Sequence, residues 1–288
     1  MKPFIQQLRT VQRRPFLLFG VFPFFVFLQR KQYVMKTLLT LIVLLVSALC
    51  FSQSVVTSNT EMNGIKFRKC GYEFSSNEFS KKIDFTLPLP SETAVLQTIS
   101  EALLMGEYDN STLEQDLKDE LASYVADRKS DTTKAEDYNE TLWSIAPVFV
   151  GGGYIAFVSS FSQKFASNEA PAPMWGDKCA VFDLSTGKRI SEDEIFDKVA
   201  EHNYLVARKL YSSLCKILKK ADDGDDVDVS FLFNDNFYFT AKELIYKYGS
   251  FEMYHTSGVT ELSLPKKWLK PYLNVDGPLY KYWFGEKK

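Results

Sequence analysis

Two strand-like segments that flank three consecutive glycines constrain the fold more than any other feature of the sequence. The segments read TLWSIAPVFV (residues 141–150) and YIAFVSSFSQKF (residues 154–165), and residues 151–153 between them are all glycine. A short glycine turn between two such segments is typical of an antiparallel hairpin. A phosphate-binding loop would instead continue into a Lys-Ser/Thr pair and a helix, and neither follows. The sequence therefore predicts a β-hairpin at these glycines.

Strand and helix patterns are mixed before the hairpin. Residues 81–90, KKIDFTLPLP, alternate apolar and polar side chains with the period of a half-buried strand. A helix is expected after Ser91, and its apolar face consists of Val95, Ile99, Ala102 and Leu103. A second helix is expected to begin at a capping box of Ser111 and Glu114. Its apolar stripe consists of Leu113, Leu117, Leu121 and Tyr124.

The C-terminal half continues this mixture with shorter strands. A helix is predicted over about residues 199–219, and its inward side chains are Leu205, Leu210, Leu214, Ile217 and Leu218. Short strands are expected at FYFT (237–240), LIYKY (244–248) and VTELSLP (259–265). The chain lacks a regular βαβ rhythm, so the predicted fold class is α+β, an antiparallel sheet with helices packed on it, in two lobes.

A polar segment separates the two predicted lobes. Residues 127–139, DRKSDTTKAEDYN, contain almost no side chains to bury and are typical of a surface loop or linker. The domain prediction is an N-terminal α+β lobe over 53–139, a C-terminal α+β domain over 140–275 and an aromatic tail over 276–288. Two interpretations of the tail aromatics are open, a platform for a partner or closure of the core. These aromatics are Tyr280, Tyr282, Trp283 and Phe284.

The N-terminal residues have the layout of an export signal. The segment MKTLLTLIVLLVSALCFSQS starts at Met35 with one lysine, continues into an apolar stretch shorter than a membrane span and ends in small residues. Residues 35–52 are therefore predicted as a signal peptide that sends the protein to the periplasm or cell envelope. Translation from Met35 is favoured over Met1, which makes 1–34 a doubtful upstream segment. Lipid attachment at Cys50 competes with plain signal cleavage, and the signal or lipid anchor is the only membrane contact expected.

The rest of the chain is acidic. Residues 1–60 hold seven of the 34 basic residues and no Asp or Glu, which leaves 27 basic against 36 acidic residues in 61–288. Such a body lacks the basic surface that nucleic acid requires. The chain has two His residues and no CxxC pair, so no metal and no other cofactor is predicted. Cys70, Cys179 and Cys215 permit at most one internal disulfide in an exported protein, and their pairing is open.

Two stretches of the second half carry a family-like pattern. They are VFDLSTGKRISEDEIF (181–196) and NFYFTAKELIYKY (236–248), which is followed by Glu252 and GVTELSLP (258–265). Together they resemble a bacterial extracytoplasmic domain family of unknown function, best known as the outer domain of the lysozyme-sensing anti-sigma factor. The resemblance covers about residues 141–274. The preceding part resembles, more weakly, a companion module found in some peptidoglycan deacetylases.

The resemblance implies an exported, non-catalytic binding module of the cell envelope. Its expected partner is a cell-wall glycan or another cell-wall component, or a secreted muramidase-like protein. Two loops depart from the family pattern, and binding specificity tends to lie in loops. The loops 166–178 and 249–258 are therefore expected to bind the partner. The candidate binding residues in them are Asn168, Glu169, Trp175, Phe251, Glu252, Tyr254 and His255.

A paired-carboxylate hydrolase of envelope glycan is the alternative function. Asp183 with Glu192, Asp193 or Glu194 would supply one protonated and one ionised carboxyl group. The competing interpretation gives these acids structural tasks, because a carboxylate at a strand end accepts hydrogen bonds from turn amides and acids in a first helical turn offset the helix dipole. Ser191 and Glu194 are expected to form a capping box at that turn. His202 is expected to be a surface or packing residue. A purely structural envelope protein is the third possibility.

Overall fold

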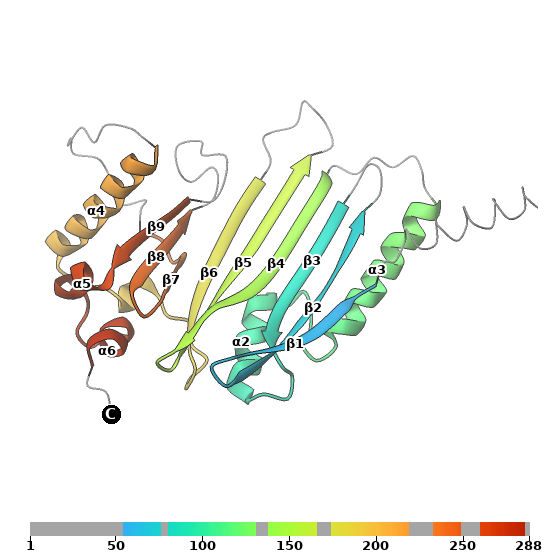
Figure 1. Ribbon diagram of the computed structural model, residues 1–288, viewed down its shortest axis with the longest axis horizontal. Coiled ribbons are helices and arrows are strands. Elements are labelled where there is room, and N and C mark those ends of the chain that lie inside the picture. Colours follow the sequence, from blue (N-terminus) through green and yellow to red (C-terminus); the bar gives the residue numbers. More distant parts are fainter. Residues whose placement is uncertain are drawn as a thin grey trace, which may run out of the picture. The chain divides into compact units, whose positions relative to one another are not determined.

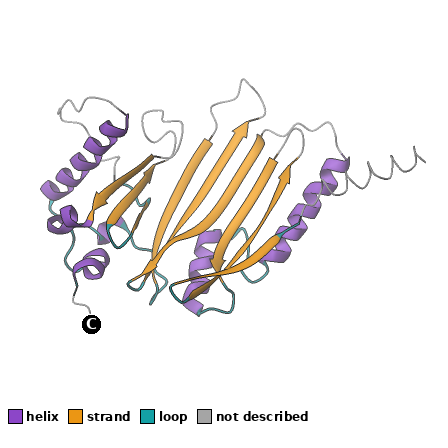
Figure 2. Cartoon of the chain, in the orientation of Figure 1, coloured by secondary structure: helices purple, strands orange, loops and turns teal. Residues whose placement is uncertain are grey.

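The computed structural model describes residues 54–75, 80–130, 138–165, 174–218, 233–248 and 260–285. Residues 53–288 form one compact unit, and its described residues contain two β-sheets and two groups of helices, α2–α3 and α4–α6 (Figures 1 and 2). The predicted α+β class is confirmed. The predicted signal peptide and Cys50 lie outside the described residues, as does residue 53. Among the described helices, none has the length and apolar character that a membrane span needs.

The larger sheet has six strands in the order of the sequence. They are β1 (Val56–Met62), β2 (Ile65–Ser75), β3 (Ser80–Pro88), β4 (Tyr138–Gly151), β5 (Tyr154–Phe165) and β6 (Met174–Asp183). Neighbours are antiparallel except β3 and β4, so the predicted antiparallel sheet contains one parallel pair. The parallel pair follows from the helical connection between its strands, which returns the chain to the end where β3 began.

The parallel pair also bears on the predicted lobes. The boundary between residues 139 and 140 falls within β4, whose neighbour in the sheet is β3 of the predicted N-terminal lobe. The segment 127–139, expected to be a loop or linker, is partly regular: α3 (Leu113–Ser130) continues to Ser130 and β4 begins at Tyr138. The sheet is therefore continuous across the predicted boundary.

The glycine hairpin forms as predicted between β4 and β5. Gly152 and Gly153 have φ angles of +61° and +85°, which glycine adopts without a side-chain clash. A Cβ atom at Gly152 would lie 2.0 Å from the ring of Tyr282, a residue of α6 (Pro278–Phe284). The turn therefore requires glycine both for its backbone angle and for the close approach of this ring.

The first hydrophobic core lies between the large sheet and two helices, α2 (Ala94–Leu104) and α3. The predicted stripe of α3 is confirmed, since Leu113, Leu117 and Leu121 are buried. The predicted face of α2 is wrong in part: Leu96, Ile99, Ser100 and Leu104 are buried, whereas Ala102 is exposed. Thr93 caps this helix by accepting a bond from the Leu96 amide, which sets the rotation of the buried face.

The expected capping box at the start of α3 does not form. The Ser111 amide N–H donates to Asp109 Oδ1 at 2.7 Å, and Glu114 pairs with Lys118 at 2.6 Å one turn farther along the helix. The turn before the helix therefore uses Asp109 instead of Glu114. Asp109 precedes Ser111 by only two residues, so its side chain reaches the Ser111 amide through a shorter loop than the Glu114 side chain would need.

The second core surrounds a three-stranded antiparallel sheet of β7 (Phe237–Phe239), β8 (Glu243–Tyr248) and β9 (Thr260–Pro265). Helix α4 (Ala200–Leu218) contacts β9 through Val206, Leu210, Leu214 and neighbouring side chains, and α5 (Lys266–Leu269) follows β9 directly (Figure 1). The predicted α4 face is correct for Leu210 and Leu214 and wrong for two residues. Leu205 is 39% exposed and Ile217 is 52% exposed, while Leu218 lies outside the described side chains.

Strand β5 contributes to both cores. Ile155 and Phe157 belong to the first core, while Ala156, between them, belongs to the second. Alternate side chains of a strand point to opposite faces, so this strand separates the two cores as a shared wall. The described residues thus form two cores that share part of one sheet.

The Asn236 side chain connects the two sheets. Its Oδ1 accepts a hydrogen bond from the Cys179 amide at 2.5 Å, and its Nδ2 donates to the carbonyl oxygens of Asp177 at 2.6 Å and Lys247 at 2.8 Å. Asp177 and Cys179 belong to β6, and Lys247 belongs to β8. One amide therefore satisfies backbone groups at the open edge of β6 and holds β8 beside it.

The aromatic tail closes the second core. Trp283 is 6% exposed, and its indole N–H donates to the Thr240 carbonyl at 2.8 Å. Tyr280, Tyr282 and Phe284 pack against the same core from α6. Of the two interpretations of these residues, core closure is therefore confirmed. Cys70, Cys179 and Cys215 are buried free thiols.

Candidate functional site

The family-like segment forms a joint between β6 and the second core. After Asp183 the chain turns and returns, with Arg189 bridging to Phe182 and the Ile190 amide bonding to the Val181 carbonyl at 2.8 Å. Ser191 then caps a single 3-10 turn, η1 (Glu192–Glu194). The acids of this segment were predicted either to meet in a catalytic site or to stabilise the joint.

Asp183 stabilises the turn. Its Oδ1 accepts the amide N–H groups of Ser185 at 2.7 Å and Thr186 at 3.1 Å. Burial tends to raise the pKa of the Asp183 carboxyl, but the hydrogen bonds from Ser185 and Thr186 outweigh this effect and lower it. The carboxylate is thus held in its ionised form by the turn itself.

Glu194 forms the predicted capping box with Ser191. Its Oε2 accepts the Ser191 amide N–H at 3.0 Å, and its Oε1 accepts a bond from the Lys188 ammonium group at 2.9 Å. The backbone bond from Ser191 and the bond from Lys188 lower the pKa of Glu194. This acid, like Asp183, is therefore used by the local fold.

Glu192 differs from both. Its Oε1 accepts a 2.5 Å hydrogen bond from the hydroxyl of Tyr246, a residue of β8 with 0% exposure. Its backbone amide donates to Asp235 Oδ1 at 2.8 Å. Burial raises the pKa of Glu192 to about 7; the Tyr246 bond opposes the shift, and the negative charges of Asp235 and Asp193 add to it. Glu192 therefore exchanges its proton near neutral pH.

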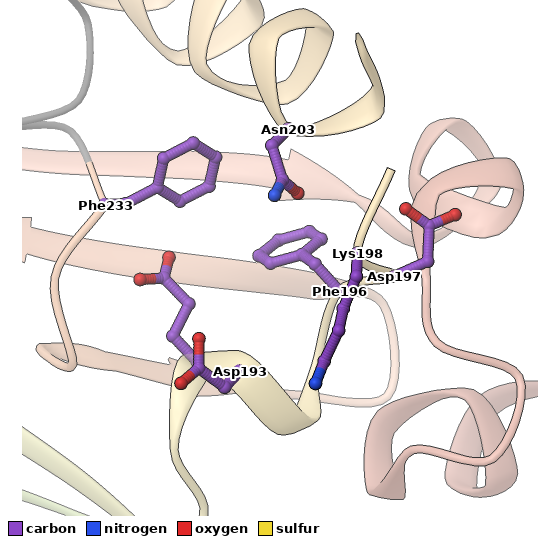
Figure 3. A pocket seen from close by; sticks show the side chains of 7 residues that line it. Asp193, Phe196, Asp197, Lys198, Asn203 and Phe233 are labelled. Atoms are coloured by element: carbon purple, nitrogen blue, oxygen red, sulfur yellow. The ribbon is translucent and has the colours of Figure 1, made fainter. Parts of the chain in front are cut away.

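Glu192 lines a pocket of about 400 Å³ beside η1. The other lining residues are Asp193, Phe196, Asp197, Lys198, Asn203 and Phe233. Phe233 and Asn203 extend from different parts of the chain toward Phe196 (Figure 3), and the Phe196 and Phe233 rings meet edge to face at 5.7 Å. The pocket thus combines carboxylate, amide and aromatic groups, a mixture that binding pockets commonly show.

Asp197 is engaged with His202 on α4. Asp197 Oδ2 lies 2.6 Å from His202 Nδ1, and Asp197 Oδ1 accepts the Val199 amide N–H at 3.2 Å. The imidazole ring also packs edge to face on Tyr272, 5.4 Å between centroids. His202 therefore packs at the start of α4, as predicted.

The four predicted acids thus occupy two different settings. Glu192 and Asp193 line the pocket, whereas Asp183 and Glu194 are not among its lining residues. The predicted binding residues Asn168, Glu169, Phe251, Glu252, Tyr254 and His255 lie outside the described residues. Trp175 lies in β6, but its side chain is outside the description as well.

Several pocket residues were not singled out from the sequence. Phe196 had a place only as a position of the family-like pattern, and Asn203 and Phe233 had none. Tyr246, another position of that pattern, and Asp235 contact Glu192 without lining the pocket. The Tyr246 hydroxyl reaches Glu192 across 54 residues of sequence. Tyr246 was placed in an expected strand and in the family-like pattern, but neither gave any sign that its hydroxyl would meet a carboxylate.

No protein-family model matches the chain, and no curated protein matches it. Among solved structures, the chain is similar to a DUF3298 family member from Bacteroides fragilis NCTC 9343, with 11% identity, a TM-score of 0.48 and coverage of 82% of this chain and 97% of that one. It is also similar to a DUF3298 family protein from Pseudomonas aeruginosa PAO1, with 15% identity, a TM-score of 0.46 and coverage of 78% and 94%. At these identities the likeness concerns the backbone alone.

The pocket's own residues decide what it can do chemically. Within the described ranges, no group of three or more His, Cys, Asp and Glu side chains is arranged to hold a metal ion. Glu192 can donate a hydrogen bond when protonated and attract a cation when ionised. Phe196 and Phe233 offer apolar surface, and the Asn203 amide offers both a donor and an acceptor.

Proposed function

We propose that the protein is an exported, non-catalytic binding module of the bacterial cell envelope. Its ligand is a cell-wall component or a secreted muramidase-like protein. The observation that carries the proposal is the Glu192 pocket, where carboxylate, amide and aromatic groups line a space of about 400 Å³. The pocket lies in the segment that resembles the extracytoplasmic family, and the export signal predicted over residues 35–52 agrees with the envelope as its location.

The fate of the other acids supports binding over catalysis. A glycan hydrolase needs two carboxyl groups on either side of the scissile bond. Asp183 and Glu194 accept backbone amides of their own segment and have lowered pKa values. Neither of them lines the pocket with Glu192, so neither is placed to act as the second carboxyl group on a ligand held there.

A retention experiment tests the proposal. The full chain, immobilised, is incubated separately with lysozyme and with soluble peptidoglycan fragments, and the retained material is measured. We expect one of the two to be retained, and retention to fall at least several-fold in the variants Asn203→Ala and Glu192→Gln. Glu114→Gln, on the far helix α3, is the matched control and should retain as wild type does. If neither lysozyme nor fragments are retained, the proposal is wrong.

A second candidate function is favoured by one observation. Glu192, with a pKa near 7, has the property of a general acid for glycoside hydrolysis at neutral pH. The exposed carboxylate of Asp193, the next residue, also lines the pocket. Release of reducing ends from peptidoglycan, lost in both Glu192→Gln and Asp193→Asn, would establish this activity in place of simple binding. Absence of release by a protein that retains the fragments would exclude it.

A further inference from the structure

The size and placement of the Glu192 pocket limit what it can hold. A volume of about 400 Å³ falls at the lower end of the range for small-molecule sites, which suits one side chain or one small organic group. Its walls come from η1, the segment 196–198, the first turn of α4 and the residue Phe233 that precedes β7. The ligand group must therefore be small enough to enter between these elements.

The charge of the surroundings favours a cation. Three carboxylates line the pocket, those of Glu192, Asp193 and Asp197, against one ammonium group, that of Lys198. A fourth carboxylate, that of Asp235, accepts the backbone amide of Glu192. An anionic ligand would be repelled by this field, and a neutral one would gain nothing from it.

The other charged groups nearby do not reverse this balance. The Arg189 guanidinium donates to the carbonyl oxygens of Asp235 at 2.6 Å and Cys179 at 3.2 Å, and the Lys188 ammonium group is paired with Glu194. His202 on α4 faces Asp197, and Tyr246 on β8 donates its hydroxyl to Glu192. Among the described residues, Glu192 Oε2 has no hydrogen-bond donor, so this oxygen is free to accept one from a ligand.

The aromatic rings suit the uncharged part of such a ligand. Phe196 is buried and Phe233 half-buried, and their rings meet at the same pocket as the carboxylate of Glu192. Aromatic rings attract cations through their faces and cover methylene groups well. The Asn203 amide, which points toward Phe196 in Figure 3, adds a polar contact on the opposite wall.

We propose that the Glu192 pocket binds its ligand through a primary ammonium group on an aliphatic stem, with the ammonium group at Glu192 Oε2 and the stem against Phe196 and Phe233. The inference rests on the proposed function and names the chemical group that the partner presents. Such a group can come from a lysine side chain of a secreted protein or from an amine of the cell wall. Since the ammonium group pairs with ionised Glu192, binding releases the proton of Glu192 below neutral pH.

The direct test uses a small probe with a matched neutral control. The probe is Nα-acetyl-lysine N-methylamide, and the control carries a second acetyl group on Nε. Binding to the full chain is measured at low ionic strength by NMR shift titration at pH 5.5 and pH 8. The probe keeps its charge at both pH values, so a change in affinity reports on the protein.

We expect the probe to bind about tenfold more tightly at pH 8 than at pH 5.5 and the control not to bind. Glu192→Gln should abolish the pH dependence and weaken binding about tenfold at pH 8, whereas Glu114→Gln should change neither. Equal binding of probe and control, tighter binding at pH 5.5, or an unaltered Glu192→Gln variant would each overturn the inference.

The sources of the amine are separated by acetylating lysozyme and the peptidoglycan fragments before the retention experiment. Loss of retention on acetylation identifies the source and supports the inference. If the small probe binds as expected but neither macromolecule is retained, the inference stands and the proposed function fails. If a macromolecule is retained regardless of acetylation and its retention still falls in Asn203→Ala, the proposed function stands and the inference fails.

Discussion

Two partly buried glutamates, Glu120 in the first core and Glu192 in the second, have opposite pKa shifts. Burial alone would raise the pKa of Glu120, but hydrogen bonds from Lys81, Tyr108 and Tyr72 outweigh it and lower the pKa. In Glu192 burial prevails, and the pKa rises to about 7. Burial therefore does not decide the charge of a carboxyl group by itself; the number and charge of its partners do.

The partners of Glu120 come from three separate places. Lys81 belongs to β3 and Tyr72 to β2, and Tyr108 lies in the connection between α2 and α3. Tyr72 and Tyr108 donate their hydroxyls to the Glu120 carboxylate at 3.0 Å and 2.6 Å, and Lys81 forms an ion pair with it. The contacts with Lys81 and Tyr72 tie α3 to the sheet, and the contact with Tyr108 ties α3 to the connection that precedes it. Within the described part of the chain, Glu192 has one donor, Tyr246, and two carboxylate neighbours, so it retains capacity for a ligand.

The largest effect is expected from Glu120→Ala. This change leaves the Lys81 ammonium group, whose side chain is 21% exposed, and two tyrosine hydroxyls without their acceptor. The free energy of unfolding at pH 7, measured by urea denaturation, should fall by about 3–4 kcal/mol. Glu114→Ala on the same helix removes only a surface pair with Lys118 and should cost less than about 0.5 kcal/mol. If Glu120→Ala and Glu114→Ala lowered the free energy of unfolding by similar amounts, Glu120 would contribute no more than a surface glutamate.

Glu192→Gln is expected to stabilise the protein at alkaline pH. The pKa of Glu192 in the folded state, about 7, lies above its ordinary value of 4.5, so the folded state holds the extra proton between these values. Wild-type stability contributed by this group is therefore complete below about pH 4.5 and is lost as the pH rises through 7. A glutamine side chain does not ionise, so the variant does not lose this stability as the pH rises. Its amide oxygen still accepts the hydrogen bond from Tyr246.

Urea denaturation at pH 5 and pH 8 measures this effect. The Glu192→Gln variant should exceed wild type by about 2–3 kcal/mol at pH 8 and by less at pH 5. A gap that is the same at both pH values would show that Glu192 does not titrate in this window. If wild type were more stable than the variant at pH 8, ionised Glu192 would stabilise the folded state, which is the opposite of what its raised pKa predicts.

Controls aside, the smallest effect is expected from Glu194→Ala, two residues from Glu192. It removes the reciprocal bond of the capping box to Ser191 and a pair with the exposed Lys188, so the cost should be about 1 kcal/mol. The lowered pKa of Glu194 makes this contribution present above its ordinary pKa and lost as the pH falls through the folded value. Wild type and variant should therefore converge in acid. If the difference in the free energy of unfolding between wild type and variant increased as the pH falls, the capping role of Glu194 would be wrong.

Local patterns predicted much of this structure. The glycine hairpin, the stripe of α3 and the Ser191–Glu194 capping box each depend on residues within a few positions of one another. The parallel pairing of β3 with β4 was not predicted, because it depends on the path of α2 and α3. The face of α4 was partly wrong for a similar reason: Leu205 and Val206 are both apolar, and only packing against β9 decides which is buried.

The site was harder to predict than the fold. The sequence marked Asp183, Glu192, Asp193 and Glu194 as one acidic group, and the fold divides them between turn, cap and pocket. The Glu192 environment depends on Tyr246 and Asp235, which are 54 and 43 residues away in the sequence. Such contacts leave no periodic trace, so the raised pKa of Glu192 follows only from the folded chain.

The most direct test is an NMR titration of the side-chain carboxyl carbons of Glu192 and Glu120, assigned with the Glu192→Gln and Glu120→Gln variants. Glu192 should titrate with a midpoint near pH 7, and Glu120 below its ordinary value of 4.5. If both carbons titrate together near pH 4.5, Glu192 is an ordinary surface acid. The pocket would then lose the proton-exchanging carboxylate on which its proposed binding chemistry depends.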